Sequence, residues 1–179
     1  MTKKISVLFF ILIFFLCSCR QSDSSIEYKK AKSDLILFDT SKIAIIKLDN
    51  QKHLIFENYK PTELTNENIL EIEKILLKCI DDYNPTQESY FKELSLKHPE
   101  YKFKRNRFII DLSDYYRQYV ASINNKGEKE VWVNCFCHNL YEDWKKYLII
   151  VEDGGNCFFN LKINLNTRKY YDLMVNGDA

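Results

Sequence analysis

Glycine and proline are scarce in this chain, with four and three residues, and only three histidines are present. The sequence contains no glycine-rich loop of the kind that cradles a phosphate and no Ser-His-Asp pattern. Neither sign of charge is in excess, since 26 Lys and Arg face 25 Asp and Glu. Proteins that bind nucleic acid rely on a basic excess, so we expect no nucleic-acid partner. Tyr and Phe are abundant, at twelve residues each, which indicates an ordered, aromatic-rich globular protein.

The N-terminus has the features of a secretory signal peptide. Lys3 and Lys4 precede an uncharged, strongly apolar stretch from Ile5 to Leu16. A charged start, an apolar middle and a small-residue end are typical of such signals. Crossing a bilayer takes about 20 apolar residues, so a permanent transmembrane helix is the poorer interpretation. We therefore predict that residues 1–18 direct export and are then removed.

The segment Leu16-Cys17-Ser18-Cys19 resembles the lipobox of bacterial lipoproteins, with a leucine three positions before the modified cysteine. The resemblance implies cleavage after Ser18 and lipid attached to Cys19, including a thioether-linked diacylglycerol. Two or more acyl chains hold a protein stably on a membrane. In lipoproteins of enteric type an Asp after the lipidated cysteine favours the inner membrane. Arg20 stands there, which favours the outer membrane over the inner. The alternative is an ordinary signal peptide with two incidental cysteines.

The remainder of the chain has the size of one domain. Removing 18 of the 179 residues leaves 161, in which 24 basic groups face 25 acidic ones. Residues Arg20 to Ser25 include no apolar side chain, so they lack the surface that would fold them. We predict a lipidated cysteine and flexible tether over residues 19–33 and a single globular domain over residues 34–179.

A main helix is predicted after Thr65, because apolar residues then recur at intervals of three and four. Thr65 suits the N-cap, and Pro85 should end the helix, with Asn84 already forced out of helical geometry. A second, short helix is predicted around residues 90–96. The apolar stripe of the main helix comprises Ile69, Ile72, Ile75, Leu76, Cys79, Ile80 and Tyr83.

Strands are predicted on both sides of this helix, separated by turn signals. Before it, Lys42 to Leu48 and His53 to Phe56 indicate a hairpin, and residues 34–39 add a strand. After it, glycines at Gly127 and at Gly154-Gly155 supply tight turns. One helix followed by an antiparallel meander predicts an α+β fold, with the helix covering one face of the sheet. The predicted C-terminal strands are Tyr116 to Ile123, Glu130 to Cys137, Tyr147 to Val151, Asn156 to Leu165 and Arg168 to Val175.

The last seventy residues or so contain several motifs of one group of proteins. They are Tyr116-Arg117-Gln118-Tyr119, the stretch Val131 to Cys137, Asp153-Gly154-Gly155 with Phe158 and Phe159 after it, and Asn176-Gly177. Through these motifs, the C-terminal part of the chain resembles a family of uncharacterised small lipoproteins from Gram-negative bacteria. The resemblance implies an architecture and a place in the cell envelope, and it implies no activity.

Four cysteines lie in the predicted domain: Cys79, Cys135, Cys137 and Cys157. Helical and strand periodicity turns all four toward the core. They can be buried thiols or form one or two disulfides in an oxidising periplasm. A bridge should join Cys135 or Cys137 to Cys157 or Cys79, because two cysteines two apart on one strand are poor partners for each other. A metal site that adds His138 is the third interpretation. His138 points away from Cys137 if the strand continues, and the C-x₂₋₄-C spacing of zinc sites is missing. We therefore predict no metal.

Aromatic side chains gather near the predicted strand of residues 130–137. Alternation places Trp132 and Phe136 on the face opposite Cys135, and Tyr141 and Trp144 follow in the next loop. If the helix covers only one face of the sheet, these rings form an exposed patch for a protein or glycan partner. The alternative is a second small core beneath the loop of residues 139–146.

Catalytic motifs are absent from the sequence. The three histidines have no neighbouring nucleophile in a known spacing, and the acidic pairs Asp81-Asp82 and Glu152-Asp153 fit solvated surface. We therefore predict a lipid-anchored envelope domain that binds a protein or glycan partner, without catalysis and without a cofactor. The alternatives are an envelope hydrolase whose carboxylates the sequence does not reveal, and an inhibitor or immunity protein of the envelope.

Overall fold

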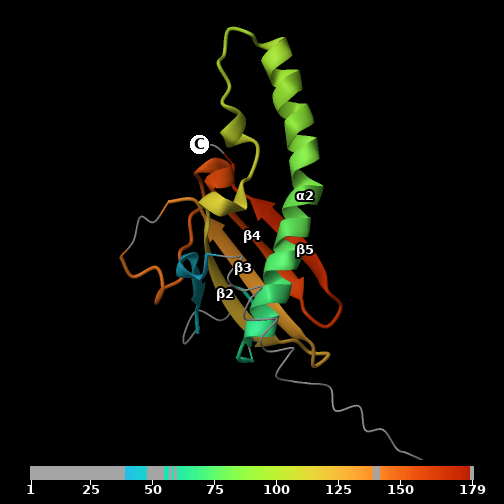
Figure 1. The fold of residues 1–179 in the computed structure, drawn as a ribbon, viewed down its shortest axis with the longest axis vertical. Coiled ribbons are helices and arrows are strands. Elements are labelled where there is room, and N and C mark those ends of the chain that lie inside the picture. Colours follow the sequence, from blue (N-terminus) through green and yellow to red (C-terminus); the bar gives the residue numbers. More distant parts are fainter. Residues whose placement is uncertain (1–38, 48–54, 57, 59, 139–141, 178–179) are drawn as a thin grey trace, which may run out of the picture.

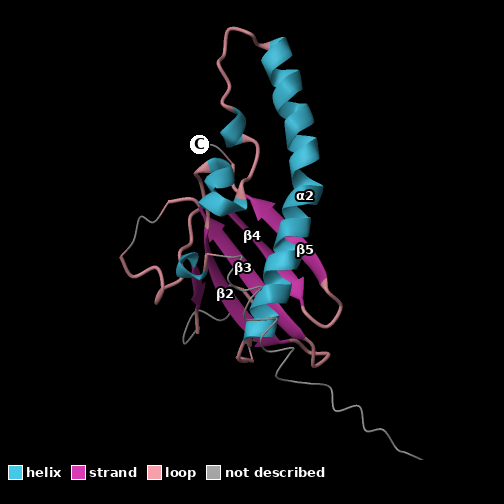
Figure 2. Cartoon of the chain, viewed as in Figure 1, coloured by secondary structure: helices cyan, strands magenta, loops and turns pink. Residues whose placement is uncertain are grey.

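The structure of the chain is a computed structural model that describes residues 39–47, 55–56, 58, 60–138 and 142–177. The predicted signal peptide, Cys19, the tether and residues 34–38 lie outside these ranges. The architecture is α+β, as predicted: one main helix lies across a five-stranded sheet (Figures 1 and 2). No helix within the described ranges combines the length and apolar character that a membrane crossing needs.

The sheet has strand order β1-β2-β3-β4-β5. Strand β1 (Ile43–Ile45) pairs in parallel with β2 (Tyr116–Ile123), and the other three pairs are antiparallel. Strands β3 (Lys129–Phe136), β4 (Phe158–Asn164) and β5 (Lys169–Val175) complete it. Tyr116, Phe136 and Phe158 are register partners, so β2 begins, β3 ends and β4 begins at one edge of the sheet.

Helix α2 (Asn66–Lys97) begins where the sequence predicts and continues well past Pro85, where the sequence predicts its end. The Thr65 and Asn68 side chains form a reciprocal capping box at its start. Pro85 lies inside the helix, so the expectation that it ends the helix, with Asn84 non-helical, is wrong. The Asn84 side chain donates to the Ile110 carbonyl and accepts from its N–H, at 2.9 and 3.0 Å. These bonds fasten the helix next to Pro85.

Beyond Pro85 the helix extends past the sheet, and residues 98–108 return alongside it (Figure 1). Phe108 packs against both Tyr90 and Phe91, with ring centroids 5.9 and 5.4 Å apart. The predicted short helix around residues 90–96 is therefore the last part of α2. Tertiary contacts on both sides of Pro85 offset the loss of one backbone hydrogen bond, which is why the helix continues.

Each face of the sheet carries its own hydrophobic core. The first core lies between the sheet and α2, and its central side chains include Ile72, Leu76, Tyr119 and Leu161. The second lies on the opposite face, where the loop after β3 covers the sheet. Its buried members are Ala44, Ile46, Phe56, Val120, Trp132, Phe136, Trp144 and Ile149.

Two predicted strands are absent from the described residues. Residues 148–151 are irregular, so β3 pairs directly with β4 across a long connection. Side chains of the sheet supply hydrogen bonds that a neighbouring strand would otherwise make: Gln118 accepts from the Ile149 N–H, and Asn134 donates to the Ile149 carbonyl. The predicted hairpin of residues 42–56 is also wrong in its described part. Strand β1 pairs in parallel with β2, while residues 55–56 form no strand and residues 48–54 lie outside the description.

Candidate functional site

A pocket of about 880 Å³ opens at the edge of the sheet where β3 ends and β4 begins. Its walls come from five parts of the chain: the 3₁₀ turn η1 (Thr40–Lys42), residues 104–109, the turn η4 (Leu112–Asp114) with the start of β2, residues 137–138, and residues 154–157. Because these segments are distant in sequence, the sequence alone could not bring them together.

Hydrogen bonds hold the walls of this pocket in place. The Asn156 side chain donates to the carbonyls of Asn106 and Ile109, at 3.0 and 3.3 Å. The Tyr115 hydroxyl donates to the Asn156 carbonyl at 2.8 Å. Gly154 begins the turn η5 (Gly155–Cys157) with a φ of 97°, and an added Cβ would lie 2.7 Å from the Phe158 ring. The pocket is therefore built by specific contacts and requires glycine at position 154.

Charged groups of both signs line the pocket. Lys42, Lys104 and Arg107 supply positive charge, and Asp111 and Asp114 supply negative charge. The Lys42 ammonium donates to the Ser113 carbonyl at 2.7 Å. Hydrogen bonds from Ser113 hold the pKa of Asp111 below its usual value, so this carboxylate is ionised at neutral pH. The pocket suits a polar ligand better than an apolar one.

A disulfide forms part of the pocket wall. Cys137 and Cys157 are bridged, with Cα atoms 5.0 Å apart, which is one of the pairings left open by the sequence. They lie one residue beyond the register pair Phe136 and Phe158, and the Cys137 N–H donates to the Cys157 carbonyl at 3.0 Å. Direct β3–β4 pairing thus brings the two sulfurs together.

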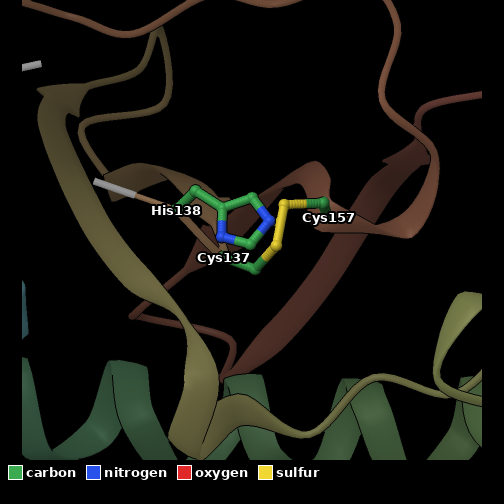
Figure 3. A group of neighbouring side chains, drawn as sticks. All are labelled: Cys137, His138 and Cys157. Atoms are coloured by element: carbon green, nitrogen blue, oxygen red, sulfur yellow. A yellow bond between two sulfur atoms is a disulfide. The ribbon is translucent and has the colours of Figure 1, made fainter. Parts of the chain in front are cut away.

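His138 lies beside this disulfide, as Figure 3 shows. Its ring nitrogen and the two sulfurs all fall within 4.8 Å of one another. We expected His138 to point away from Cys137 only if the strand continued, and this condition is not met, because β3 ends at Phe136 and alternation does not extend to residue 138. Cys137, His138 and Cys157 could hold a metal ion only after reduction, since thiolates are the ligands.

The two remaining cysteines of the predicted domain are free and buried. Cys79 on α2 and Cys135 on β3 belong to the first core. Burial raises the pKa of Cys79 to about 11 and raises that of Cys135 further. Thiolate is the reactive form, so these two side chains act as small apolar groups. Cys19 lies outside the described residues.

The predicted aromatic patch is a second core. Trp132, Phe136 and Trp144 are buried, so the interpretation of these three rings as an exposed binding surface is wrong, and Tyr141 lies outside the described residues. Fully buried Gln118 donates to the carbonyls of Trp144 and Tyr147, at 2.5 and 2.7 Å. These bonds anchor the loop over the rings.

A second pocket, of about 600 Å³, lies between α2 and residues 105–117. Glu73 and Arg117 line it, yet both are buried, at 0% and 5% exposure. Arg117 Nε lies 3.3 Å from Glu73 Oε1, and the Tyr119 hydroxyl donates to the same carboxylate oxygen. Arg117 also donates to the carbonyls of Tyr115 and Leu112, at 3.1 and 2.8 Å.

This buried group is a structural network more than an accessible site. Burial raises the pKa of Glu73, opposed by the Arg117 charge and the Tyr119 hydrogen bond. Among the described residues, Glu73 Oε2 has no hydrogen-bond partner. The sequence does contain a signal for this buried network, because Glu73 lies four residues after Ile69 and three before Leu76, in the apolar stripe. A charged residue there implies a buried partner.

Comparison of the chain with family models, with curated proteins and with solved structures finds no match. The lipobox and the resemblance of the C-terminal part to small Gram-negative lipoproteins stay predictions.

Proposed function

We propose that the chain is a lipid-anchored cell-envelope domain that binds a polar segment of a protein or glycan partner in the pocket at the β3–β4 edge. The anchor rests on the signal-peptide pattern and on the position of Cys19 after Leu16. The observation that supports binding is the pocket of about 880 Å³, whose polar walls are held by the Asn156 hydrogen bonds. A site formed before binding loses little ordering entropy when its ligand arrives.

Other parts of the chain pack on both faces of the sheet. Helix α2 packs on one face, and the loop that includes Trp144 packs on the β1–β3 part of the other. We place partner binding at the loops that line the larger described pocket, at the edge of the sheet. Cations and carboxylates occur together there, which fits a ligand with hydrogen-bonding groups of both kinds and argues against a lipid tail.

The anchor is tested by replacing the lipidated cysteine. Cys19→Ala should abolish incorporation of a labelled fatty acid and release the protein from membranes, while the matched variant Cys17→Ala should keep both. Membranes separated by density should then carry the native protein in the outer-membrane fraction. Labelling that persists in Cys19→Ala refutes the anchor.

Binding is tested by charge reversal in the pocket. Lys104→Glu should reduce capture of the native partner from solubilised membranes, because Lys104 lines the pocket. Lys126→Glu, in the β2–β3 turn, changes the same charge away from the pocket and should leave capture intact. Equal capture by both variants and the native chain would show that the partner does not bind in this pocket.

An envelope hydrolase is the second candidate function, because Asp111, Asp114 and His138 line the same pocket. Asp114→Asn separates the two candidates. A hydrolase that uses this carboxylate loses turnover of isolated envelope material, whereas the binding domain shows no turnover before or after the change. An inhibitor or immunity role is a form of binding, and the captured partner would be an enzyme whose activity falls on addition of this protein.

A further inference from the structure

The Cys137–Cys157 disulfide is accessible from the pocket. Both cysteines are partly exposed and line its wall. An incoming thiol can reach the bridge through this pocket, which has a volume of about 880 Å³. Disulfides that are exposed to solvent are the ones that exchange or regulate, whereas buried ones are inert.

The charges around the bridge favour a thiolate leaving group. The His138 imidazole lies within 4.8 Å of both sulfurs, and an imidazole N–H next to a cysteine can donate a hydrogen bond to its thiolate. Three further cations from other segments, Lys42, Lys104 and Arg107, line the same pocket. The remaining charged and titratable groups of its lining are Asp111, Asp114, Tyr115 and Tyr116.

Competing thiol chemistry is absent from the described part of the domain. Cys79 and Cys135 are 1% and 0% exposed, and burial holds both in the thiol form. Neither can attack the bridge from solvent or capture a reagent in the native state. Exchange is thereby confined to the two sulfurs beside His138.

The loop closed by the bridge has other attachments. Gln118 and Asn134 bond to its backbone at residues 144, 147 and 149. The Asn176 side chain donates to the carbonyls of Val151 and Asp153, at 2.6 and 3.0 Å. The β3–β4 ladder reaches Phe136 and Phe158 without the bridge. The fold can therefore accommodate both redox states of this pair.

We propose that Cys137–Cys157 is a thiol–disulfide exchange site, with small-molecule dithiols and protein thiols as its substrate class and His138 as the residue that stabilises the leaving sulfur. A thiol first gives its proton to solvent. The thiolate forms a bond to one sulfur of the bridge, the S–S bond breaks, and its electron pair goes to the other sulfur, which leaves as a thiolate beside His138. The second thiol of the dithiol then attacks the mixed disulfide, so the dithiol leaves oxidised and both cysteines remain reduced. This inference goes beyond the proposed binding function and does not depend on it.

The test uses the full chain and dithiothreitol under native conditions. Differential alkylation with residue-level mass spectrometry follows Cys137 and Cys157, while circular dichroism follows the fold. We expect both cysteines to become alkylated with the fold retained, and Cys79 and Cys135 to stay protected. His138→Gln should slow reduction, per unit of dithiothreitol thiolate, by about tenfold, because the variant loses the imidazole that lies within 4.8 Å of both sulfurs.

His98→Gln is the matched control, because His98 lies at the end of α2 and pairs with Glu100. It should leave the rate unchanged. The proposal is overturned if the bridge is reduced only after denaturation, if reduction unfolds the domain, or if His138→Gln is reduced as fast as the native chain.

Discussion

The buried pair of Glu73 and Arg117 allows a sharp test of the core. Glu73→Ala removes the carboxylate beside Arg117, which is 5% exposed in the native structure. Among the described residues, the hydrogen-bond acceptors left to the guanidinium are the carbonyls of Tyr115 and Leu112. Removal of one partner from a buried ion pair costs about 3 to 5 kcal/mol, because the other charge remains buried without compensation. We expect a loss of this size in the free energy of unfolding, measured by urea denaturation and tryptophan fluorescence.

Glu71→Ala is the matched control. Glu71 lies two residues earlier on α2 and pairs with exposed Arg168 at 3.2 Å, so its loss should cost less than about 1 kcal/mol. Similar losses in the two variants would contradict the assignment of Glu73 to a buried network.

The same residue predicts a dependence of stability on pH. Burial raises the pKa of Glu73 in the folded state, so between the ordinary glutamate pKa and the raised value the folded protein holds a proton that the unfolded chain has already released. Its contribution to stability is fully present below the ordinary glutamate pKa and is lost as pH rises through the raised value. In the variant Glu73→Gln the side chain at this position is an amide, which does not ionise. The native chain should therefore lose stability relative to this variant as pH rises through that window, and a constant difference would refute the argument.

Two further predictions concern helix α2. Ile72→Ala and Leu76→Ala should each lower the free energy of unfolding by about 2 to 5 kcal/mol, since both side chains are fully buried. Lys74 is exposed, so Lys74→Ala should change the free energy of unfolding by less than about 0.5 kcal/mol. Equal effects in denaturant titrations would mean that the helical stripe is misassigned. Pro85→Ala should stabilise the protein by about 1 to 3 kcal/mol, because the Asp81 carbonyl regains its helical donor, and an unchanged melting temperature would contradict this.

The sequence predicted features that depend on local pattern. The Thr65 cap, the apolar stripe of α2 and the strand of residues 116–123 follow from hydrogen-bonding preference and periodicity alone. The continuation of α2 through Pro85 does not, since it depends on contacts with Ile110 and Phe108, which are distant in sequence.

Long-range side-chain contacts also explain the other differences. Residues 148–151 look like a strand by composition, but Gln118 and Asn134 satisfy backbone groups of their loop from the sheet face. Trp144 belongs to the same loop and is buried because the loop packs on the sheet. The pairing of Cys137 with Cys157 required knowledge that β3 and β4 are neighbours, which alternation within each strand could not provide.

Photo-crosslinking in living cells tests the proposed function most directly. A photoreactive amino acid at Asn106, an exposed residue of the pocket wall, is compared with the same amino acid at Lys126 in the β2–β3 turn. We expect an adduct of one defined partner at position 106, recovered with the membrane fraction, and no such adduct at position 126. Absence of any adduct at position 106, or equal adducts at both positions, would contradict a binding site in this pocket.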